Sequence, residues 1–202
     1  MDSPVDGGGS FPYTGCHRER LLKETEEEPA MEIRRERPED FDGIYRFVKE
    51  AFATARVSDG TEQDYVNRLR ASKGYIPELA LVAEEAGDLA GYVMLTRQSV
   101  ALPTGEERQE LLLAPLAVAC QRRGQGIGGM LTREALRRAE AMGYSAVFLV
   151  GDWGYYGRLG FLRADELGIA NENGVPGEHF LACPLREGAL EELAGGRVAF
   201  LE

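Results

Sequence analysis

The sequence is poor in the residues that most often bind metals or form disulfides. Only three of its 202 residues are cysteine and two are histidine. No two of the cysteines, Cys16, Cys120 and Cys183, have the Cys-x-x-Cys spacing, so neither a disulfide framework nor a zinc site is indicated. His17 and His179 lie far apart in the chain, with no cluster of cysteines or carboxylates around them. We therefore expect no metal site and no Ser-His-Asp hydrolase.

Long apolar runs and excess positive charge are also absent from the sequence. No apolar stretch approaches the ~20 residues that a transmembrane helix requires. The chain has 23 Lys and Arg against 34 Asp and Glu, which gives a formal net charge of −11. Binding of nucleic acid without regard to its sequence depends on basic surfaces. We therefore expect neither a membrane nor a nucleic acid as its partner, and the cysteine pattern favours a reduced, cytoplasmic protein.

The first thirty residues differ in composition from the rest of the chain. Residues 1–30 mix Gly, Pro and Ser with a run of three glutamates, and they keep no helical or strand period. This composition is typical of a terminal tail, and it lacks the cationic start and apolar core of a signal peptide. We expect a flexible or loosely docked extension at 1–30, with Met31 as the natural start, and one domain at 31–202.

The remaining chain combines strand and helix patterns in an order that indicates an α/β fold with a mixed sheet. Two apolar runs flank a turn at Gly87 and form a hairpin signal, and Thr61 to Asp64 resembles a helix capping box. Hairpin strands ahead of a single β-α-β unit predict a mixed sheet with helices on both faces. We expect strands at 31–35, 79–83, 89–95, 109–118, 145–150 and 178–185, and helices from Pro38, from Thr61, from Ile127, within 151–161 and at 188–193.

A glycine-rich turn after the fourth expected strand is the most informative motif. Gly124, Gly126 and Gly129 spell G-x-G-x-x-G, and Arg122 and Arg123 precede them. A strand that feeds such a turn into a helix N-terminus presents backbone N–H groups to an anion. Glycine also lets a phosphate approach the backbone without a Cβ in the way. The alternative is a turn that only packs tightly and binds nothing.

A nucleotide-dependent oxidoreductase is the weakest functional interpretation of this turn. Asp152 ends the next strand, where an acid in a dinucleotide-binding fold holds a ribose. A Rossmann domain, however, begins with its fingerprint strand, whereas here three strands come first and only fifty residues follow Asp152. A P-loop is excluded because no Gly-Lys-Ser/Thr ends the turn.

The turn and the segment that follows it resemble the GNAT superfamily of acetyl-CoA-dependent N-acetyltransferases. The resemblance covers roughly the last 170 residues and rests on "PLAVACQRRGQGIGGMLTREALRRAEAMGY", on "AVFLVGDWGYYGRLGF" and on the order of the elements. The chain is similar to a bacterial subgroup of predicted N-acetyltransferases. The resemblance implies the GNAT fold, in which helices flank both faces of a mostly antiparallel sheet that is splayed at its middle strands.

The resemblance also implies which residues bind the coenzyme. Two registers of [QR]-x-x-G-x-G overlap, and the five-residue spacing from Val118 that family members keep selects the register beginning at Arg123 over the one at Gln121. Family members hold the pyrophosphate with backbone amides of this motif and pair the pantetheine arm with the strand before it. Pro115 lacks an N–H and marks a bulge or splay there. The implied coenzyme-binding residues are Leu116, Ala117, Val118, Arg123, Gly124, Gln125, Gly126, Ile127 and Gly128.

The implied catalytic residue is Tyr156, which stands four residues before the Gly160–Phe161 pair. Family members place a tyrosine there as general acid for the departing thiolate. A phenol with a pKa of roughly 10 is protonated at neutral pH and can donate to a thiolate whose conjugate thiol has a pKa of roughly 8.5. The alternative for Tyr156 is a core tyrosine without a chemical role. We expect Tyr155 to be a packing or channel residue.

The general base stays open at this level. Some histone-modifying relatives carry a glutamate fourteen residues before the first glycine of the motif, a position that is Leu112 in the chosen register. Glu110 fits only the rejected register, and Glu62 is more typical of a solvated acid in the first turn of a helix. We favour a chain of water molecules. Cys120 replaces a proline that many relatives carry and is expected to be a small buried residue.

These observations predict an N-acetyltransferase that moves acetyl from acetyl-CoA to a primary amine by direct transfer. The expected partner is a small-molecule or peptide amine, and the acidic surface mildly favours a cationic one. A homodimer is an open alternative to a monomer. The rival function from another class is a non-catalytic acyl-CoA-binding or regulatory GNAT-like module.

Overall fold

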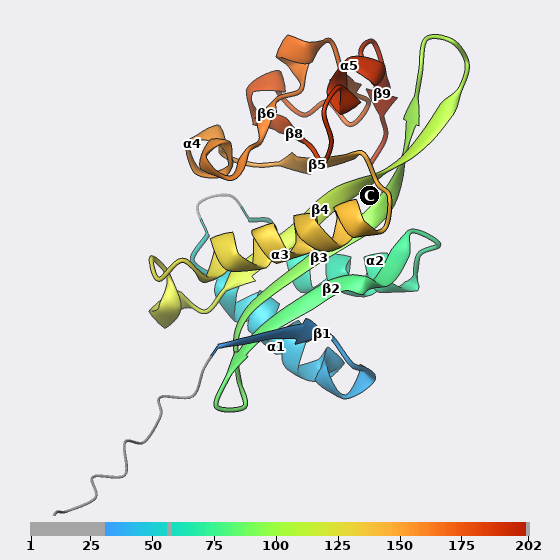
Figure 1. Ribbon diagram of the computed structural model, residues 1–202. Helices are drawn as coiled ribbons and strands as arrows, with labels where there is room; N and C mark the ends of the chain where they lie inside the picture. The colour runs from blue at the N-terminus through green and yellow to red at the C-terminus, as the bar shows by residue number, and fades with distance from the viewer. Residues whose placement is uncertain (1–30, 56–57, 201–202) are drawn as a thin grey trace, which may run out of the picture.

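A nine-stranded sheet runs through the computed structural model, which describes residues 31–55 and 58–200 (Figure 1). The predicted extension at 1–30 lies outside the described residues, so its boundary with the domain at 31–202 stays a prediction. The strands are β1 (Glu32–Arg35), β2 (Tyr75–Glu85), β3 (Asp88–Ala101), β4 (Glu107–Val118), β5 (Ala146–Val150), β6 (Leu162–Arg163), β7 (Ala170–Asn171), β8 (Phe180–Pro184) and β9 (Arg197–Val198).

The sheet is mixed and mostly antiparallel, as predicted. Its strand order is β1-β2-β3-β4-β5-β8-β6, while β9 pairs with β3 and β7 at one end. Only β4 with β5 and β7 with β9 run parallel among the pairs of described strands. The short strands β6, β7 and β9 were not predicted, because two residues are too few to show an alternating pattern.

Helices cover both faces of this sheet, which confirms the predicted layers. The α-helices are α1 (Phe41–Phe52), α2 (Glu62–Ala71), α3 (Ile127–Ala141), α4 (Trp153–Tyr156) and α5 (Ala189–Glu192), and the 3-10 helices are η1 (Pro38–Asp40), η2 (Cys120–Arg122), η3 (Gly157–Leu159), η4 (Asp165–Leu167) and η5 (Gly177–His179). Helix α3 crosses one face, and α1 and α2 lie behind the other (Figure 1). No helix within the described part of the chain is long and apolar enough to cross a membrane.

Each face of the sheet has its own apolar core because the side chains of a strand alternate between faces. Val93 and Leu95 of β3 point toward Leu131 of α3 and its neighbours. Tyr92 and Met94 point the other way and pack with buried residues of α1 and α2. The expected apolar period of α3 is confirmed, since Ile127, Leu131, Ala135 and Ala139 are all buried.

The N-terminus of α2 differs from the prediction in its capping. Thr61 is the N-cap residue, but its side chain accepts no hydrogen bond from the helix. Its Oγ1 instead donates to Asp59 Oδ1 at 2.7 Å, so the expected capping box does not form. Gln63, in the first turn of α2, instead donates its Nε2 to the carbonyl oxygen of Gly60 at 2.8 Å.

A buried carboxylate fixes α2 against the sheet. Glu36 follows β1, and both of its oxygens accept from Arg70 of α2, at 3.0 and 2.8 Å. The hydroxyls of Tyr75 and Tyr92 donate to the same carboxylate at 2.8 and 2.9 Å. Burial, together with the neighbouring charge of Glu36, raises the pKa of both tyrosines, so they remain protonated donors. Four donors thus satisfy one buried charge, as burial of a charge requires.

Strand β4 bulges at Pro115 and then separates from β5, as predicted. Val93 pairs with Leu116 whereas Leu95 pairs with Leu113, so β4 contains one residue more than β3 in this interval. Strands β4 and β5 pair only through Leu111 and Leu112. The last six residues of β4 therefore have no pairing with β5. This splay opens the sheet beside the start of α3.

Candidate functional site

The glycine turn presents open backbone at the N-terminus of α3. Gly124 and Gly126 have φ angles of +78° and +83°, in the left-handed region that favours glycine. A Cβ built on either residue would have no atom within 4 Å, so this side of the turn is open. Gly126 is the N-cap of α3, a helix of 15 residues. The first N–H groups of α3 and the helix dipole therefore provide a site for an anion.

Near the end of β4, the backbone N–H and C=O groups of two residues point into the gap between β4 and β5. The N–H of Ala119 donates to the carbonyl oxygen of Ala90 at 3.0 Å, which fixes the hydrogen-bonding phase of the β3–β4 ladder. Hydrogen-bonded and non-hydrogen-bonded pairs alternate in such a ladder. Ala117 therefore bonds to β3, whereas the N–H and C=O groups of Leu116 and Val118 point toward the splay. An extended ligand arm can pair with these two residues.

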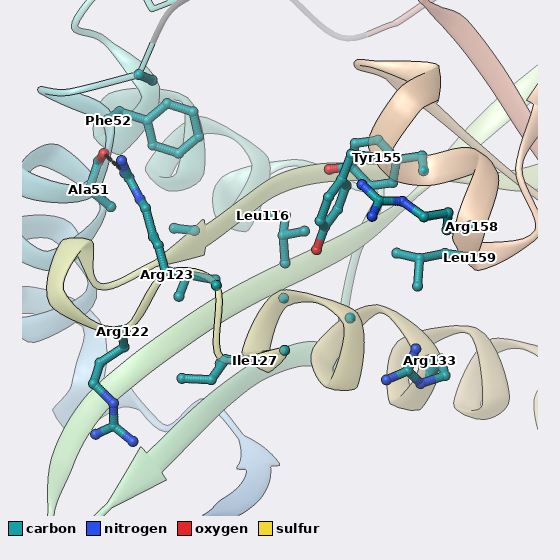
Figure 2. Close-up of a pocket in the computed structure, with 18 residues that line it drawn as sticks. Ala51, Phe52, Leu116, Arg122, Arg123, Ile127, Arg133, Tyr155, Arg158 and Leu159 are labelled. Atoms are coloured by element: carbon teal, nitrogen blue, oxygen red, sulfur yellow. Dashed lines mark hydrogen bonds between the residues drawn. The ribbon is translucent and has the colours of Figure 1, made fainter.

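A cavity of about 770 Å³ joins the glycine turn to the splay. Of the ten predicted site residues, all except Gln125 line it; the amide oxygen of Gln125 instead accepts from Arg122 Nε at 2.9 Å. Their roles in binding and catalysis stay predictions. The cavity is shown in Figure 2, and its lining residues are Ala51, Phe52, Ala55, Leu116, Ala117, Val118, Arg122, Arg123, Gly124, Gly126, Ile127, Gly128, Gly129, Arg133, Tyr155, Tyr156, Arg158 and Leu159.

The two arginines of the turn are engaged within the protein. Arg122 forms an ion pair with Glu85 at 2.5 Å, which offsets its positive charge. Arg123 reaches across to the end of α1 (Figure 2), where it donates to Ala51 O at 2.5 Å and to Thr54 Oγ1 at 2.9 Å. A cation at the C-terminus of a helix is favourable, and here it holds the turn against α1. Any role of Arg123 in anion binding thus falls to its backbone.

The ring of Tyr156 packs among aromatic side chains at the edge of the cavity. Its ring packs edge-on against Phe161 at 5.5 Å and against Tyr155 at 4.9 Å between ring centroids. A Cβ on Gly151 would lie 2.6 Å from the Cε2 atom of Tyr156, so only glycine admits the ring there. Burial, and secondarily the neighbouring Tyr155, raises the pKa of Tyr156 above its usual value near 10. The hydroxyl is therefore a proton donor at neutral pH.

Tyr155 lies beside the glycine turn, in keeping with the expected channel residue. A Cβ on Gly128 would be 2.5 Å from the hydroxyl oxygen of Tyr155, so the hydroxyl approaches the first turn of α3 closely. Burial raises the pKa of Tyr155, and the charges of Arg133 and Arg158 oppose that effect. Asp152, the acid of the oxidoreductase interpretation, caps α4 by accepting from Gly154 N at 2.9 Å.

Sequence reasoning missed the cavity residues that come from other elements. Phe52 and Ala55 belong to the end of α1 and the segment after it, while Arg133 and Arg158 come from α3 and η3. Arg133 and Arg158 sit in the quoted segments, but nothing in the local pattern separates them from solvated surface arginines. Cys120 was expected to be buried and is exposed, with its Sγ 3.4 Å from Thr54 Oγ1.

The two glutamates weighed as general bases lie in different settings, and neither lines the cavity. Glu110 is buried and accepts from Ser145 N at 3.0 Å, from Ala146 N at 2.9 Å and from Ser145 Oγ. This carboxylate holds the chain at the start of β5. Glu62 buries its Oε2 atom without a hydrogen-bond partner among the described residues. The general base therefore stays open.

Replacing Glu110 by alanine should lower the free energy of unfolding by about 2 kcal/mol, because it leaves buried backbone donors of Ser145 and Ala146 unpaired. Urea unfolding measures this change. The kcat of any acetyl transfer should stay within about twofold, since Glu110 lies outside the cavity. A stable variant with a collapsed kcat would instead identify Glu110 as the base.

Among the described ranges, 31–55 and 58–200, no group of three or more His, Cys, Asp or Glu residues is arranged to hold a metal ion. The splayed sheet, the glycine turn at the start of α3 and the tyrosine beside it are the arrangement expected of a GNAT-fold acyltransferase. Residues 32–164 match the acetyltransferase (GNAT) domain family, and this match covers more than half of the chain. The chain therefore belongs to the GNAT family of acetyltransferase enzymes.

Two curated relatives come from Escherichia coli. The uncharacterized N-acetyltransferase YjhQ is 35% identical over 121 residues, a match that covers 58% of this chain and 65% of YjhQ. The uncharacterized N-acetyltransferase YhbS is 34% identical over 131 residues, which are 65% of this chain and 73% of YhbS. The match thus spans slightly less than two thirds of one relative and more than two thirds of the other.

Solved structures support the same assignment and show coenzyme-bound relatives. The crystal structure of E. coli YhbS in complex with CoA has a TM-score of 0.75 and 30% identity, covering 86% of this chain and 91% of that chain. A GNAT family acetyltransferase from Brucella melitensis, in complex with acetyl-CoA, has a TM-score of 0.64 and 32% identity, covering 77% and 88%. The GNAT fold predicted from the sequence is confirmed.

Proposed function

We propose that this protein transfers the acetyl group of acetyl-CoA to a primary amine, with both substrates bound at once. The observation that carries the proposal is one cavity that combines the anion-binding turn, the backbone groups of Leu116 and Val118, and the protonated hydroxyl of Tyr156. The coenzymes named for the YhbS and Brucella structures support it.

The parts of the cavity correspond to the parts of the coenzyme. The pyrophosphate fits the turn from Arg123 to Gly128, whose backbone is open where a side chain would stand at Gly124 and Gly126. The amide-rich pantetheine arm fits the backbone groups of Leu116 and Val118, because both partners are extended and carry alternating donors and acceptors. Ala117 lies between these two residues and lines the cavity with its small side chain.

When bound, the coenzyme supplies an acetyl group already activated as a thioester. The chain's own contribution is then alignment, polarisation and one proton. A backbone N–H in the splay polarises the thioester carbonyl, and the cavity walls hold the amine nitrogen in line with it. Tyr156 donates its proton to the sulfur as the C–S bond breaks and the C–N bond forms. The ammonium loses one proton to water before the attack, the nitrogen loses a second to water as the C–N bond forms, and Tyr156 regains a proton from solvent.

Ala51, Phe52 and Ala55 form one side of the cavity, against which the acceptor amine can bind. These residues are apolar, so they contact the carbon skeleton of an acceptor and not its charge. The acidic net charge of −11 favours the approach of a cationic amine over the whole surface. Small-molecule amines and lysine-containing peptides both meet these conditions.

Thermal unfolding with and without acetyl-CoA tests the proposal. A ligand that binds only the native state, at about a hundredfold its Kd, adds about 2.7 kcal/mol of stability. For a domain of this size that corresponds to a rise in Tm of roughly 5 to 10 °C. NADH at the same concentration should give no rise, because the fold offers no dinucleotide crevice.

The outcomes separate the rival functions. A rise with acetyl-CoA, followed by release of free thiol when a panel of primary amines is added, supports the enzyme. A rise without thiol release from any amine in the panel would favour the non-catalytic acyl-CoA-binding module. No rise at millimolar acetyl-CoA would refute coenzyme binding by the cavity.

A further inference from the structure

Two arginines line the cavity on the side opposite the arginines of the turn. Arg133 extends from α3 and Arg158 from η3, and Figure 2 shows them beyond Tyr155, away from Arg122 and Arg123. They come from separate elements and yet face one space. The cavity therefore has a second cationic end, which the pyrophosphate turn does not explain.

The charges of these two side chains are not neutralised within the described part of the chain. No hydrogen bond or ion pair joins Arg133 to another described residue, and its terminal nitrogens lie 3.4 Å from the Cβ position of Gly129. Arg158 donates only its Nε, to Gly154 O at 3.0 Å. By contrast, Arg137 of α3 pairs with Glu134 at 2.8 Å. Arg133 and Arg158 thus form no ion pair with a described carboxylate and can both pair with an anionic ligand.

The charges of both guanidinium groups affect the same side chain, Tyr155, which lies beside the glycine turn. The charges of Arg133 and Arg158 lower the pKa of Tyr155, against the larger effect of burial. The hydroxyl of Tyr155 in turn lies beside Gly128 in the first turn of α3. Both positive charges therefore lie within electrostatic reach of Tyr155 and line the same cavity.

The charge of each phosphate decides which anion suits this pair. Coenzyme A carries a pyrophosphate whose two phosphates bear one negative charge each, and a phosphate monoester on its ribose. A monoester bears about −1.5 to −2 at pH 7 and has three strong acceptor oxygens. Backbone amides suit the pyrophosphate, whereas a pair of guanidinium groups suits a dianion, because charge-assisted hydrogen bonds to Arg are short and strong.

We propose that Arg133 and Arg158 bind the 3′-phosphate of the coenzyme and make the enzyme selective for CoA over 3′-dephospho-CoA. This inference rests on the proposed function, since it concerns the same ligand. It adds a specificity site to the coenzyme cavity. Both arginines are positioned to bind the coenzyme and take no part in the acetyl transfer step.

Isothermal titration of CoA and of 3′-dephospho-CoA tests the assignment on the full chain. The wild type should bind CoA at least about tenfold more tightly than 3′-dephospho-CoA. Arg133→Gln and Arg158→Gln should each weaken CoA binding by roughly fivefold to tenfold and change 3′-dephospho-CoA binding by less than twofold. Arg137→Gln is the matched control, because Arg137 also lies on α3 but outside the cavity; it should change neither Kd.

The two ligands separate failure of this inference from failure of the proposed function. Equal affinity of the wild type for both ligands would overturn the assignment while leaving coenzyme binding intact. Equal losses for both ligands in the two variants would place the arginines on the pyrophosphate and also overturn it. If the wild type binds neither ligand, the proposed function itself fails and this inference fails with it. Circular dichroism of each variant shows that the fold is retained.

Discussion

Replacing Tyr156 by phenylalanine should lower kcat for acetyl transfer by about a thousandfold while the Kd for CoA stays within about twofold. General acid catalysis by a positioned group contributes typically 10²- to 10⁴-fold. The substitution removes only the hydroxyl, so the ring keeps its contacts with Phe161 and its close approach to Gly151. Steady-state kinetics and a separate titration of CoA measure the two quantities.

Tyr155→Phe is the matched control for this prediction, because it removes the neighbouring hydroxyl from the same helix. It should change kcat by less than about tenfold. The pH profile gives a second check: burial raises the pKa of Tyr156, so its protonated form persists as pH rises past the usual value of about 10. Tyr156 should therefore cause no loss of kcat below pH 10. A larger loss in Tyr155→Phe than in Tyr156→Phe would assign the acid to Tyr155.

Replacing Gly126 by valine should weaken CoA binding by at least about a hundredfold. The residue has a φ of +83°, and the space where its Cβ would stand contains no protein atom within 4 Å. In the proposed complex that space belongs to the pyrophosphate, so a branched side chain displaces the ligand from the backbone amides. Titration of CoA against the purified variant measures the change.

Gly143→Val separates blocking of the site from backbone strain. Gly143 follows the other end of α3 with a φ of +88°, and its Cβ position is equally empty, but it does not line the cavity. Both variants place a branched residue in a left-handed conformation, which costs roughly 1–2 kcal/mol of stability. Both should therefore lose similar stability, while only Gly126→Val loses CoA binding. Comparable losses of affinity in both variants would rule out the turn as the pyrophosphate site.

Much of the fold was predictable because its signals are local in sequence. Runs of apolar residues predicted the hairpin strands, an apolar residue at every fourth position predicted α3, and a proline without an N–H marked the bulge in β4. The capping box at Thr61 was wrong because the hydroxyl has a second partner nearby, Asp59, and sequence alone does not show which contact wins. Strand β9 was missed because it has only two residues and its pairing with β3 joins residues almost a hundred positions apart.

The site likewise contains residues that local motifs predict and residues that only the packing of the fold brings together. The glycine turn, Leu116, Val118 and Tyr156 belong to contiguous motifs, and they do line one cavity. Phe52, Arg133 and Arg158 reach that cavity only through the packing of α1, α3 and η3, which no local pattern encodes. Glu110 illustrates the opposite case: its residue type fits catalysis, but its three hydrogen bonds to Ser145 and Ala146 show a structural role.

The contact between Arg123 and the end of α1 has a consequence for the entropy of binding. Its two hydrogen bonds, to Ala51 and Thr54, order the glycine turn before any ligand arrives. A flexible loop loses conformational freedom when it closes on a ligand, and that loss weakens binding. In this protein the loss occurs when the chain folds. If the turn binds the pyrophosphate as proposed, this ordering makes its affinity correspondingly greater, without any contact from the Arg123 side chain.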